Sequence, residues 1–301
     1  MESNLSMIHN DKDKFSNLVD RIATQTGFYA PLMEKDYYIT LILSQINKLS
    51  ENLFLKGGTC LNKIYYSYYR LSEDLDFSMR LPDNTATRSI RHKCIQPVKN
   101  NIESFAKQFG MYIEGIESAG RNTSKQYIYS FIYNSAIVPT EQTIKIEIGL
   151  RFNPIDKTET HSVQHKFLHA FTGEPLFDGG KINCLSLNEI VSEKLRAAAL
   201  RLIVAPRDFY DLDFILRNGF DLTNKKVIGL FKKKIEEDGG DTDLAKYRVN
   251  LGRSDSEIKD MRSRIQAELL GVLTEKEQHN FNLDKALERI NNAMELYLQG
   301  Y

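Results

Sequence analysis

Apolar positions in the first half of the chain follow two spacings, one of three to four residues and one of two. The wider spacing predicts helices over residues 11–26, 34–49 and 88–109, because it places apolar side chains on one helix face. The two-residue spacing predicts strands, since successive strand side chains point to opposite faces of a sheet. Strands are expected at residues 52–55, 74–79, 112–116, 125–133 and 143–150.

The second half of the chain is mainly helical in its pattern. Residues 151–185 lack a clear period and contain several Pro and Gly breakers, so we expect them to be irregular or extended. Helices are expected at residues 187–204, 208–216, 224–237, 243–252, 254–271 and 284–298. We therefore predict an α+β fold, with a mixed α/β core and N-terminal helices at residues 1–155 and a mostly helical domain at residues 156–301.

A glycine turn follows the first predicted strand. Gly57 and Gly58 end that strand, and glycine lets the backbone turn sharply and lets a ligand approach it closely. Thr59 is expected to be the N-cap of the short helix that comes next. The tyrosine-rich segment 60–69 is interpreted as packing rather than as a platform for stacked bases.

Carboxylates stand on the polar faces of two predicted strands. Asp74 and Asp76 share one face of strand 74–79, and two adjacent carboxylates repel each other unless a cation lies between them. Glu147 projects from the polar face of strand 143–150 and joins the pair if the two strands are neighbours. Three carboxylates beside a glycine turn suit phosphoryl chemistry on a nucleoside triphosphate with Mg²⁺, which prefers oxygen ligands.

A lysine and two acids mark the helical half. Lys194 lies on the helix predicted at 187–204, and a lysine near a triphosphate supplies positive charge. Asp208 and Asp211 are three residues apart, so they share a face of the next helix. The simpler alternatives are a lysine that extends along its helix to solvent and acids that stabilise a helix N-terminus.

Composition narrows the class of protein. Lys and Arg number 40, as do Asp and Glu, so the net charge is +0 and any binding to nucleic acid needs a local patch. The three cysteines are scattered, which indicates reduced thiols and a cytoplasmic location. An apolar run of about 18 residues is lacking, so we expect no membrane segment and no secretion signal.

Two further patterns allow two interpretations each. His161, His165 and His169 are spaced by four, which would align them on a helix for metal binding, but apolar residues alternate with them as in an extended, solvent-facing segment. Basic residues are frequent between positions 225 and 264. They indicate either a solvated helix face or a contact for an RNA backbone.

The residues around the glycine turn resemble a known family. Lys56-Gly-Gly-Thr-Cys-Leu-Asn-Lys, followed by Arg70-Leu-Ser-Glu-Asp-Leu-Asp-Phe, looks like the first motif of the AbiEii nucleotidyltransferase toxins of the DNA polymerase β-like superfamily. A second match joins Glu193-Lys-Leu-Arg-Ala to Arg207-Asp-Phe-Tyr-Asp-Leu. The resemblance covers about residues 30–216, including an entry helix that begins near Glu34, and implies a nucleotidyltransferase-type mixed sheet with flanking helices.

The resemblance implies a role for each matching residue. The nucleotide-binding set is Lys56, Gly57, Gly58, Thr59, Ser72 and Lys194. The metal-binding set is Asp74 and Asp76, with Glu147 added by its strand context. The catalytic set comprises these three acids together with Lys194, Asp208 and Asp211. The chain departs from the family pattern in two places. Leu71 replaces a common aromatic residue, and Arg201 lies farther from Arg207 and Asp208 than is usual, so Arg201 is not counted among the expected site residues.

The expected function is transfer of a nucleoside monophosphate from an NTP, GTP or CTP, to an acceptor hydroxyl with Mg²⁺. The resemblance implies a toxin of a toxin–antitoxin or abortive-infection system, a separate antitoxin protein and RNA, above all tRNA, as acceptor. We expect the catalytic cleft between residues 53–150 and 187–216. Two alternatives remain open: a nucleotidyltransferase acting on a small molecule or a protein side chain, and a nucleotide-binding protein without catalysis.

Overall fold

The computed structural model describes residues 7–244 and 253–299, and these form two compact units. Unit 1 contains the residues up to 153 together with 159–184, and unit 2 contains 154–158 and the residues from 185 onward. Segment 159–184, which lies in the predicted helical domain, thus belongs by its contacts to unit 1. Within the described residues, no helix has the length and apolar character needed to cross a membrane.

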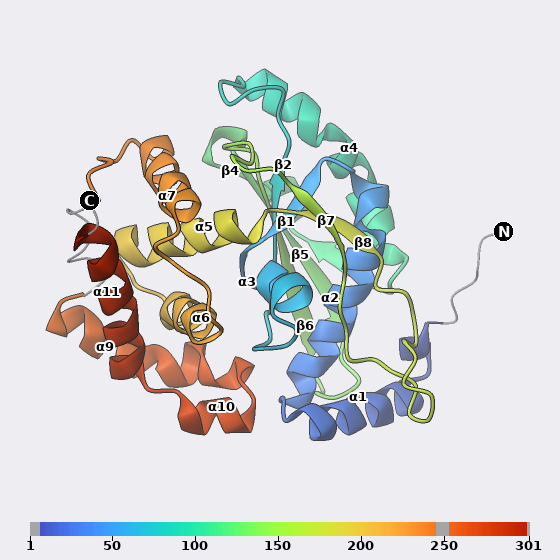
Figure 1. The fold of residues 1–301 in the computed structure, drawn as a ribbon. Helices are drawn as coiled ribbons and strands as arrows, with labels where there is room; N and C mark the ends of the chain where they lie inside the picture. The colour runs from blue at the N-terminus through green and yellow to red at the C-terminus, as the bar shows by residue number, and fades with distance from the viewer. Residues whose placement is uncertain (1–6, 245–252, 300–301) are drawn as a thin grey trace. The chain divides into compact units, whose positions relative to one another are not determined.

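Unit 1 is built on one mixed sheet of eight strands (Figure 1). The strands are β1 (Leu53–Lys56), β2 (Leu75–Met79), β3 (Tyr112–Glu114), β4 (Gly120–Arg121), β5 (Gln126–Asn134), β6 (Glu141–Gly149), β7 (Glu159–Ser162) and β8 (Lys181–Cys184). Their order is β3-β5-β6-β2-β1-β8-β7, with β4 beside β5. The β1–β8 and β2–β6 pairs are parallel and the other pairs are antiparallel, so the fold class predicted from sequence is confirmed.

Helices accompany this sheet in unit 1. They are η1 (Ile8–Asn10), α1 (Lys12–Thr26), α2 (Ala30–Leu49), α3 (Gly57–Cys60), η2 (Leu61–Tyr65), α4 (Arg88–Lys107), η3 (Ile116–Ser118) and η4 (Asn122–Ser124). Helix α2 packs against β6 and β8, and α4 packs against α2 and β3. Because α2 is surrounded in this way, most of its side chains are buried, which explains why its apolar residues are not confined to one face.

The predicted alternation of β2 and β6 is present in the structure. Leu75, Phe77 and Met79 of β2 are buried, as are the three isoleucines of β6, while the residues between them are more exposed. Burial of each such side chain contributes about 1.5–3 kcal/mol relative to exposure. The apolar face therefore fixes which face carries the polar residues.

Three strands and one cap differ from the prediction. Five strands are expected from the pattern, but β4, β7 and β8 also join the sheet. Segment 151–185 was expected to be irregular or extended, and its strands are too short and too polar to show an alternating pattern. Thr59 is not an N-cap, because α3 already begins at Gly57 with Lys56 as its cap residue.

Unit 2 is helical in its described residues apart from segment 154–158 and the connecting turns. Its helices are α5 (Leu187–Leu200), α6 (Pro206–Arg217), α7 (Lys225–Glu237), α9 (Asp255–Glu268), η5 (Leu270–Val272), α10 (Glu275–Asn280) and α11 (Leu283–Gln299). Helix α6 packs against α5, α9 and α11, and α5 packs against α7. The short α10 was not predicted, and most of the helix predicted at 243–252 lies outside the described residues.

Candidate active site

The two central acids are brought together by strand register. Asp76 of β2 lies opposite Glu147 of the parallel strand β6 and, on its other side, opposite Lys56 of β1. Neighbouring strands are about 4.8 Å apart, so these three side chains project side by side from one face of the sheet. The condition set by the sequence, that the strands of Asp76 and Glu147 be neighbours, is therefore met.

The glycine turn lies against Asp76. Gly57 has a φ of 69°, and a Cβ placed on it would lie 2.7 Å from Oδ2 of Asp76. A Cβ on Gly58 would lie 2.5 Å from the Arg70 guanidinium and 3.3 Å from Oγ of Ser72. A residue with a side chain would therefore displace these groups, which is the physical reason for two glycines here.

Thr59 has a different role from the predicted cap. Its buried hydroxyl donates a hydrogen bond of 2.5 Å to the backbone carbonyl of Asp74. That bond holds the backbone of Asp74, one residue before β2 begins, and so fixes the position from which the Asp74 side chain projects. Asp74 itself is exposed, whereas Asp76 is half-buried.

A buried ion pair lies on the helix that follows the glycines. Lys63 donates hydrogen bonds to Asp36 at 2.7 Å, to Thr40 at 2.9 Å and to the Tyr68 hydroxyl at 2.8 Å, and Tyr68 donates to Asp36 at 2.5 Å. All four side chains are buried. Burial lowers the pKa of Lys63, although the adjacent Asp36 carboxylate acts in the opposite direction. The pairing of Lys63 with Asp36 joins α2 to η2, so no local sequence pattern indicates it.

In unit 2, Lys194 is held by the two acids predicted to accompany it. Its Nζ lies 2.9 Å from Oδ1 of Asp208 and 2.7 Å from Oδ2 of Asp211. Arg201 adds a second cation, with NH1 2.6 Å from the other oxygen of Asp208. Arg201, which the family pattern left unassigned, thus belongs to this cluster. The simple picture of a lysine extending to solvent does not hold, since its side chain is only 13% exposed.

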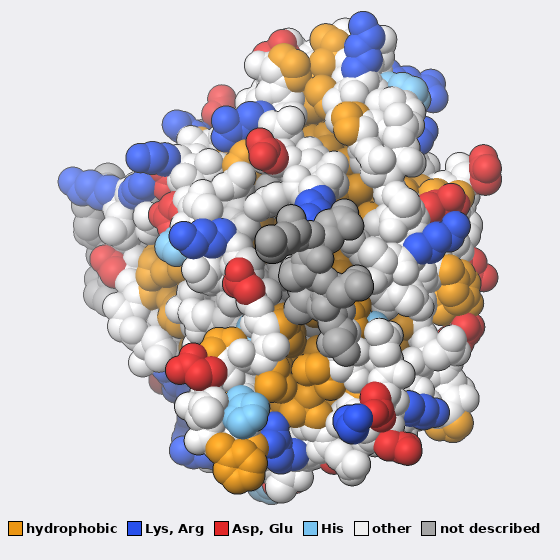
Figure 2. Space-filling model, turned by 90° about the vertical axis from the view of Figure 1, so that its right-hand side faces the viewer, with side chains coloured by type: hydrophobic (Ala, Val, Ile, Leu, Met, Phe, Trp, Pro, Cys, Tyr) orange, Lys and Arg blue, Asp and Glu red, His pale blue; other side chains and the backbone are white. Residues whose placement is uncertain are grey.

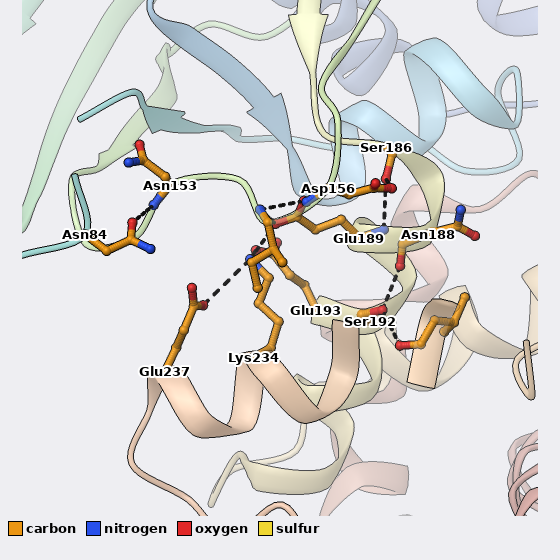
Figure 3. Close-up of polar contacts among 12 residues, drawn as sticks. Asn84, Asn153, Asp156, Ser186, Asn188, Glu189, Ser192, Glu193, Lys234 and Glu237 are labelled. Carbon is orange, nitrogen blue, oxygen red and sulfur yellow. Dashed lines mark hydrogen bonds and ion pairs between the residues drawn. The ribbon is translucent and has the colours of Figure 1, made fainter. Parts of the chain in front are cut away.

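A second charged cluster in unit 2 surrounds Lys234 (Figure 3). Its Nζ lies 2.7 Å from Glu189, 3.1 Å from Glu193 and 3.9 Å from Glu237. Burial alone would lower the pKa of Lys234, but the carboxylates of Glu193 and Glu189 outweigh it and raise that pKa. Glu189 and Glu193 are one turn apart on α5 and face the same side of the helix. This spacing could have indicated from the sequence that both acids contact one cation.

Glu189 also anchors the segment that crosses into unit 2. Its carboxylate accepts hydrogen bonds from the backbone N–H groups of Ile155 and Asp156, at 3.0 and 2.9 Å. The Asp156 carboxylate in turn accepts from the Ser186 hydroxyl at 2.6 Å and pairs with Lys226 at 2.8 Å. Two residues of the expected basic stretch, Lys226 and Lys234, are therefore already neutralised by acids of unit 2.

Glu237 gives this cluster a pH dependence. Burial raises the pKa of Glu237 from 4.5 to about 7, so the folded state binds its proton more tightly than the unfolded state. Stability is therefore lost as pH rises through the range 4.5 to 7. At pH 8, Glu237→Gln removes a buried charge and should stabilise the folded state by roughly 1 kcal/mol after solvent screening, which raises the melting temperature by about 2 °C. At pH 4 the substitution should have little effect.

Thermal melts of the wild type and of Glu237→Gln at the two pH values check this expectation. Glu236→Gln, on the exposed neighbouring position, is the matched control and should not alter the pH dependence. An equal effect of Glu237→Gln at both pH values would contradict the assigned cause.

The three histidines do not converge. His161 contacts Glu159 at 2.8 Å on β7, His165 stacks on Phe177 with ring centroids 4.5 Å apart, and His169 lies exposed in a turn. These positions agree with an extended segment, but His165 is half-buried against Phe177 and does not face solvent as expected. Among the described residues, no group of three or more His, Cys, Asp or Glu side chains is arranged to hold a metal ion.

The predicted site residues thus fall into two groups. Unit 1 brings together Lys56, Gly57, Gly58, Ser72, Asp76 and Glu147. Asp74 lies one residue before β2, where the Thr59 hydroxyl holds its backbone carbonyl. Unit 2 brings together Lys194, Asp208 and Asp211. The expectation that the two groups share one cleft stays a prediction.

Comparisons with known proteins give the following matches. The family model described as "Nucleotidyl transferase AbiEii toxin, Type IV TA system" matches residues 41–291. The solved structure of MenT4, a nucleotidyltransferase toxin of Mycobacterium tuberculosis H37Rv, is similar with a TM-score of 0.56 and 18% identity, over 91% of this chain and 98% of that one. A Helicobacter pylori structure described as a candidate nucleotidyltransferase has a TM-score of 0.50 and 17% identity, over 89% and 95% of the two chains. No curated protein matches the chain.

Proposed function

The chain belongs to the AbiEii family of nucleotidyltransferase toxins of type IV toxin–antitoxin systems, and from this we propose that it transfers a nucleoside monophosphate from an NTP to a hydroxyl group of RNA. A nucleotide substrate and an antitoxin partner follow from the family. Three finer points belong to the proposal: tRNA as the leading acceptor, GTP or CTP as the donor, and the cytoplasm as the location.

The observation that carries the proposal is the register of β2 and β6, which places Asp76 beside Glu147 next to the Gly57 turn. The donor atoms at this place are carboxylate oxygens, which suit Mg²⁺. We assign Asp74, Asp76 and Glu147 as the residues that would hold the ion. A magnesium site of this class uses one or two carboxylates and completes its ligands with substrate phosphates and water, so a preformed three-residue site is not required. When bound, the ion would neutralise charge on the triphosphate.

The residues around the acids have separate tasks in this proposal. The backbone at Gly57 and Gly58 approaches the triphosphate, and Lys56 and Ser72 contact it. An acceptor hydroxyl attacks the α-phosphorus, and a new P–O bond forms as the bond to pyrophosphate breaks. The proton of that hydroxyl passes to a carboxylate, for which we propose Glu147.

Lys194 supplies further positive charge for the triphosphate, and Asp208 and Asp211 orient it. The contacts of 2.9 and 2.7 Å support the orienting role, since two carboxylates restrict a flexible side chain to one direction. Arg201 holds Asp208 from its other side.

The experiment is to incubate the protein with each NTP labelled at the α-phosphorus, Mg²⁺ and total RNA, and to separate RNA, protein and small molecules. We expect label in RNA, and no transfer when the label is on the γ-phosphorus. Label in protein or in a small molecule alone would overturn the RNA acceptor and favour the corresponding alternative. NTP binding without transfer to any fraction would favour a nucleotide-binding protein without catalysis.

A further inference from the structure

We propose that a basic surface of unit 1, formed by α4 and the β4–β5 turn, binds the phosphate backbone of the RNA acceptor. We call it the α4–turn patch and define it by its five cations: Arg88, Arg91, Lys99, Arg121 and Lys125. This inference rests on the proposed function, because it specifies where the RNA substrate of that function is held.

Contacts between α4 and the turn bring these cations to one place. Arg91 of α4 donates a hydrogen bond of 3.3 Å to the carbonyl of Thr123 in the turn. Nζ of Lys99 lies 5.9 Å from the ring centroid of Tyr127, just after the turn on β5. Residues 122–124 all have positive φ angles, which are uncommon for residues other than glycine. The hydrogen bond from Arg91 to Thr123 helps to hold the turn in this conformation.

The cations of the patch are not neutralised by acids of the protein. None of its five cations forms an ion pair with an acid among the described residues, and four of the five side chains are exposed. In unit 2 the cations between residues 225 and 264 are of both kinds: Arg262 pairs with Asp284 and Arg264 with Glu268, whereas Lys225, Lys232 and Lys233 of α7 form no ion pair among the described residues. The patch therefore retains its full positive charge for a partner.

Local composition also favours a polyanion. Between residues 80 and 125 the chain has eight Lys and Arg but four Asp and Glu, in a protein of zero net charge. Figure 2 shows Lys and Arg side chains at the top of the molecule, where Figure 1 draws the first part of α4. From Arg88 to Lys99 the helix rises about 17 Å, which is longer than a single triphosphate and suits a chain of phosphates.

The lack of a strongly exposed large hydrophobic residue favours RNA over a protein partner. None of the strongly exposed large hydrophobic residues in the described part of the chain belongs to segments 80–107 or 120–127. Protein interfaces have a buried core of aromatic and aliphatic side chains, whereas nucleic-acid interfaces are polar and positively charged.

The patch begins close to the acids of the same unit. Ile128 of β5 lies opposite Glu147, and the Lys125 carbonyl accepts a hydrogen bond of 2.8 Å from the backbone of Leu150. Lys125 and Ile128 are three positions apart in the chain, which corresponds to about 10 Å in a strand. The turn therefore lies at the same end of the sheet as Glu147. Helix α4 covers the other face, because its Phe105 packs against Phe131, whose side chain points away from the face of Glu147. An RNA acceptor held on the patch would therefore pass around this end of the sheet to reach Glu147.

The test uses the full chain and unfractionated tRNA as probe. The triple variant Arg88→Gln/Lys99→Gln/Lys125→Gln removes three cations whose side chains make no hydrogen bond within the described residues. We expect the Kd for tRNA to rise about tenfold or more at ~0.1 M salt, and the slope of log K against log salt to fall by about 2. NTP binding and the thermal melt of the variant should match the wild type.

The matched comparison is Lys225→Gln/Lys232→Gln/Lys233→Gln on α7, which removes the same charge from exposed or half-exposed positions. Its Kd for tRNA should stay within about twofold. Equal losses in both variants, or none in the α4–turn variant, would overturn the proposal. Polyglutamate serves as an acidic polypeptide probe. If the α4–turn variant loses affinity for polyglutamate but binds tRNA as the wild type does, the patch binds a protein and the proposal is overturned. If the wild type labels no RNA while the patch variant still loses tRNA binding, the proposed function fails and the RNA-binding surface stands.

Discussion

Replacing Asp76 by Asn should lower nucleotide transfer by about 10³-fold or more while the protein stays folded. Asp76 lies between Lys56 and Glu147 in the sheet, and its Oδ2 faces the Gly57 backbone. Asn keeps the volume of the side chain but removes the charge that would hold Mg²⁺ and its triphosphate, and removing electrostatic stabilisation from phosphoryl transfer has effects of this size. Initial rates of label transfer from α-labelled NTP measure the loss.

The stability of this variant separates a chemical role from a structural one. Relief of repulsion with the neighbouring Glu147 should leave the unfolding midpoint of Asp76→Asn close to that of the wild type. Asp20→Asn is the matched control, because Asp20 is an exposed aspartate on α1 of the same unit, and it should alter neither property. Transfer within tenfold of the wild-type rate in Asp76→Asn would refute the assigned site.

Replacing Lys63 by Met should destabilise the protein by about 3–5 kcal/mol. The change removes the cation that Asp36 contacts and leaves a carboxylate buried without its counter-charge, and loss of one partner of a buried pair costs this much. The Tyr68 hydroxyl remains as a neutral partner of Asp36 and cannot replace the charge. Urea unfolding followed by far-UV circular dichroism is suitable, since the chain has no tryptophan.

Two further variants test whether the loss of stability in Lys63→Met comes from the unpaired buried charge of Asp36. Lys14→Met breaks an ion pair of the same 2.6 Å N···O distance, but Lys14 and Asp11 are 81% and 47% exposed, so the loss should stay below about 1 kcal/mol. The double variant Lys63→Met/Asp36→Leu removes both charges and should recover much of the stability. A double variant less stable than Lys63→Met would show that the unpaired charge is not the cause.

Helices and the main strands could be predicted from the sequence because their signals are local. Helix α1 begins after Asp11, whose side chain caps it, and ends at Gly27, which has a φ of 74°. The alternation of β2 and β6 was sufficient to assign their buried and polar faces. By contrast, β8 has four residues and joins the sheet by pairing with β1, from which it is separated by more than a hundred residues.

The position of Glu147 opposite Asp76 could not be predicted from the sequence. The alternating pattern predicted that Asp74 and Asp76 share a strand face after a glycine turn and that Glu147 lies on a polar strand face. In the structure β2 begins at Leu75, one residue after Asp74. Only the tertiary structure placed Glu147 opposite Asp76, because the parallel pairing of β2 with β6 depends on the whole sheet and on burial of the other face.

The same distinction holds for the charged residues. Their types and intervals are visible in the sequence, including the three-residue spacing of Asp208 and Asp211. Which charges neutralise one another was decided by packing, since Lys194 meets those acids between two helices and Lys63 meets Asp36 inside unit 1. Packing also left the α4–turn cations unpaired among the described residues, because long-range contacts, unlike helical periodicity, depend on the complete fold.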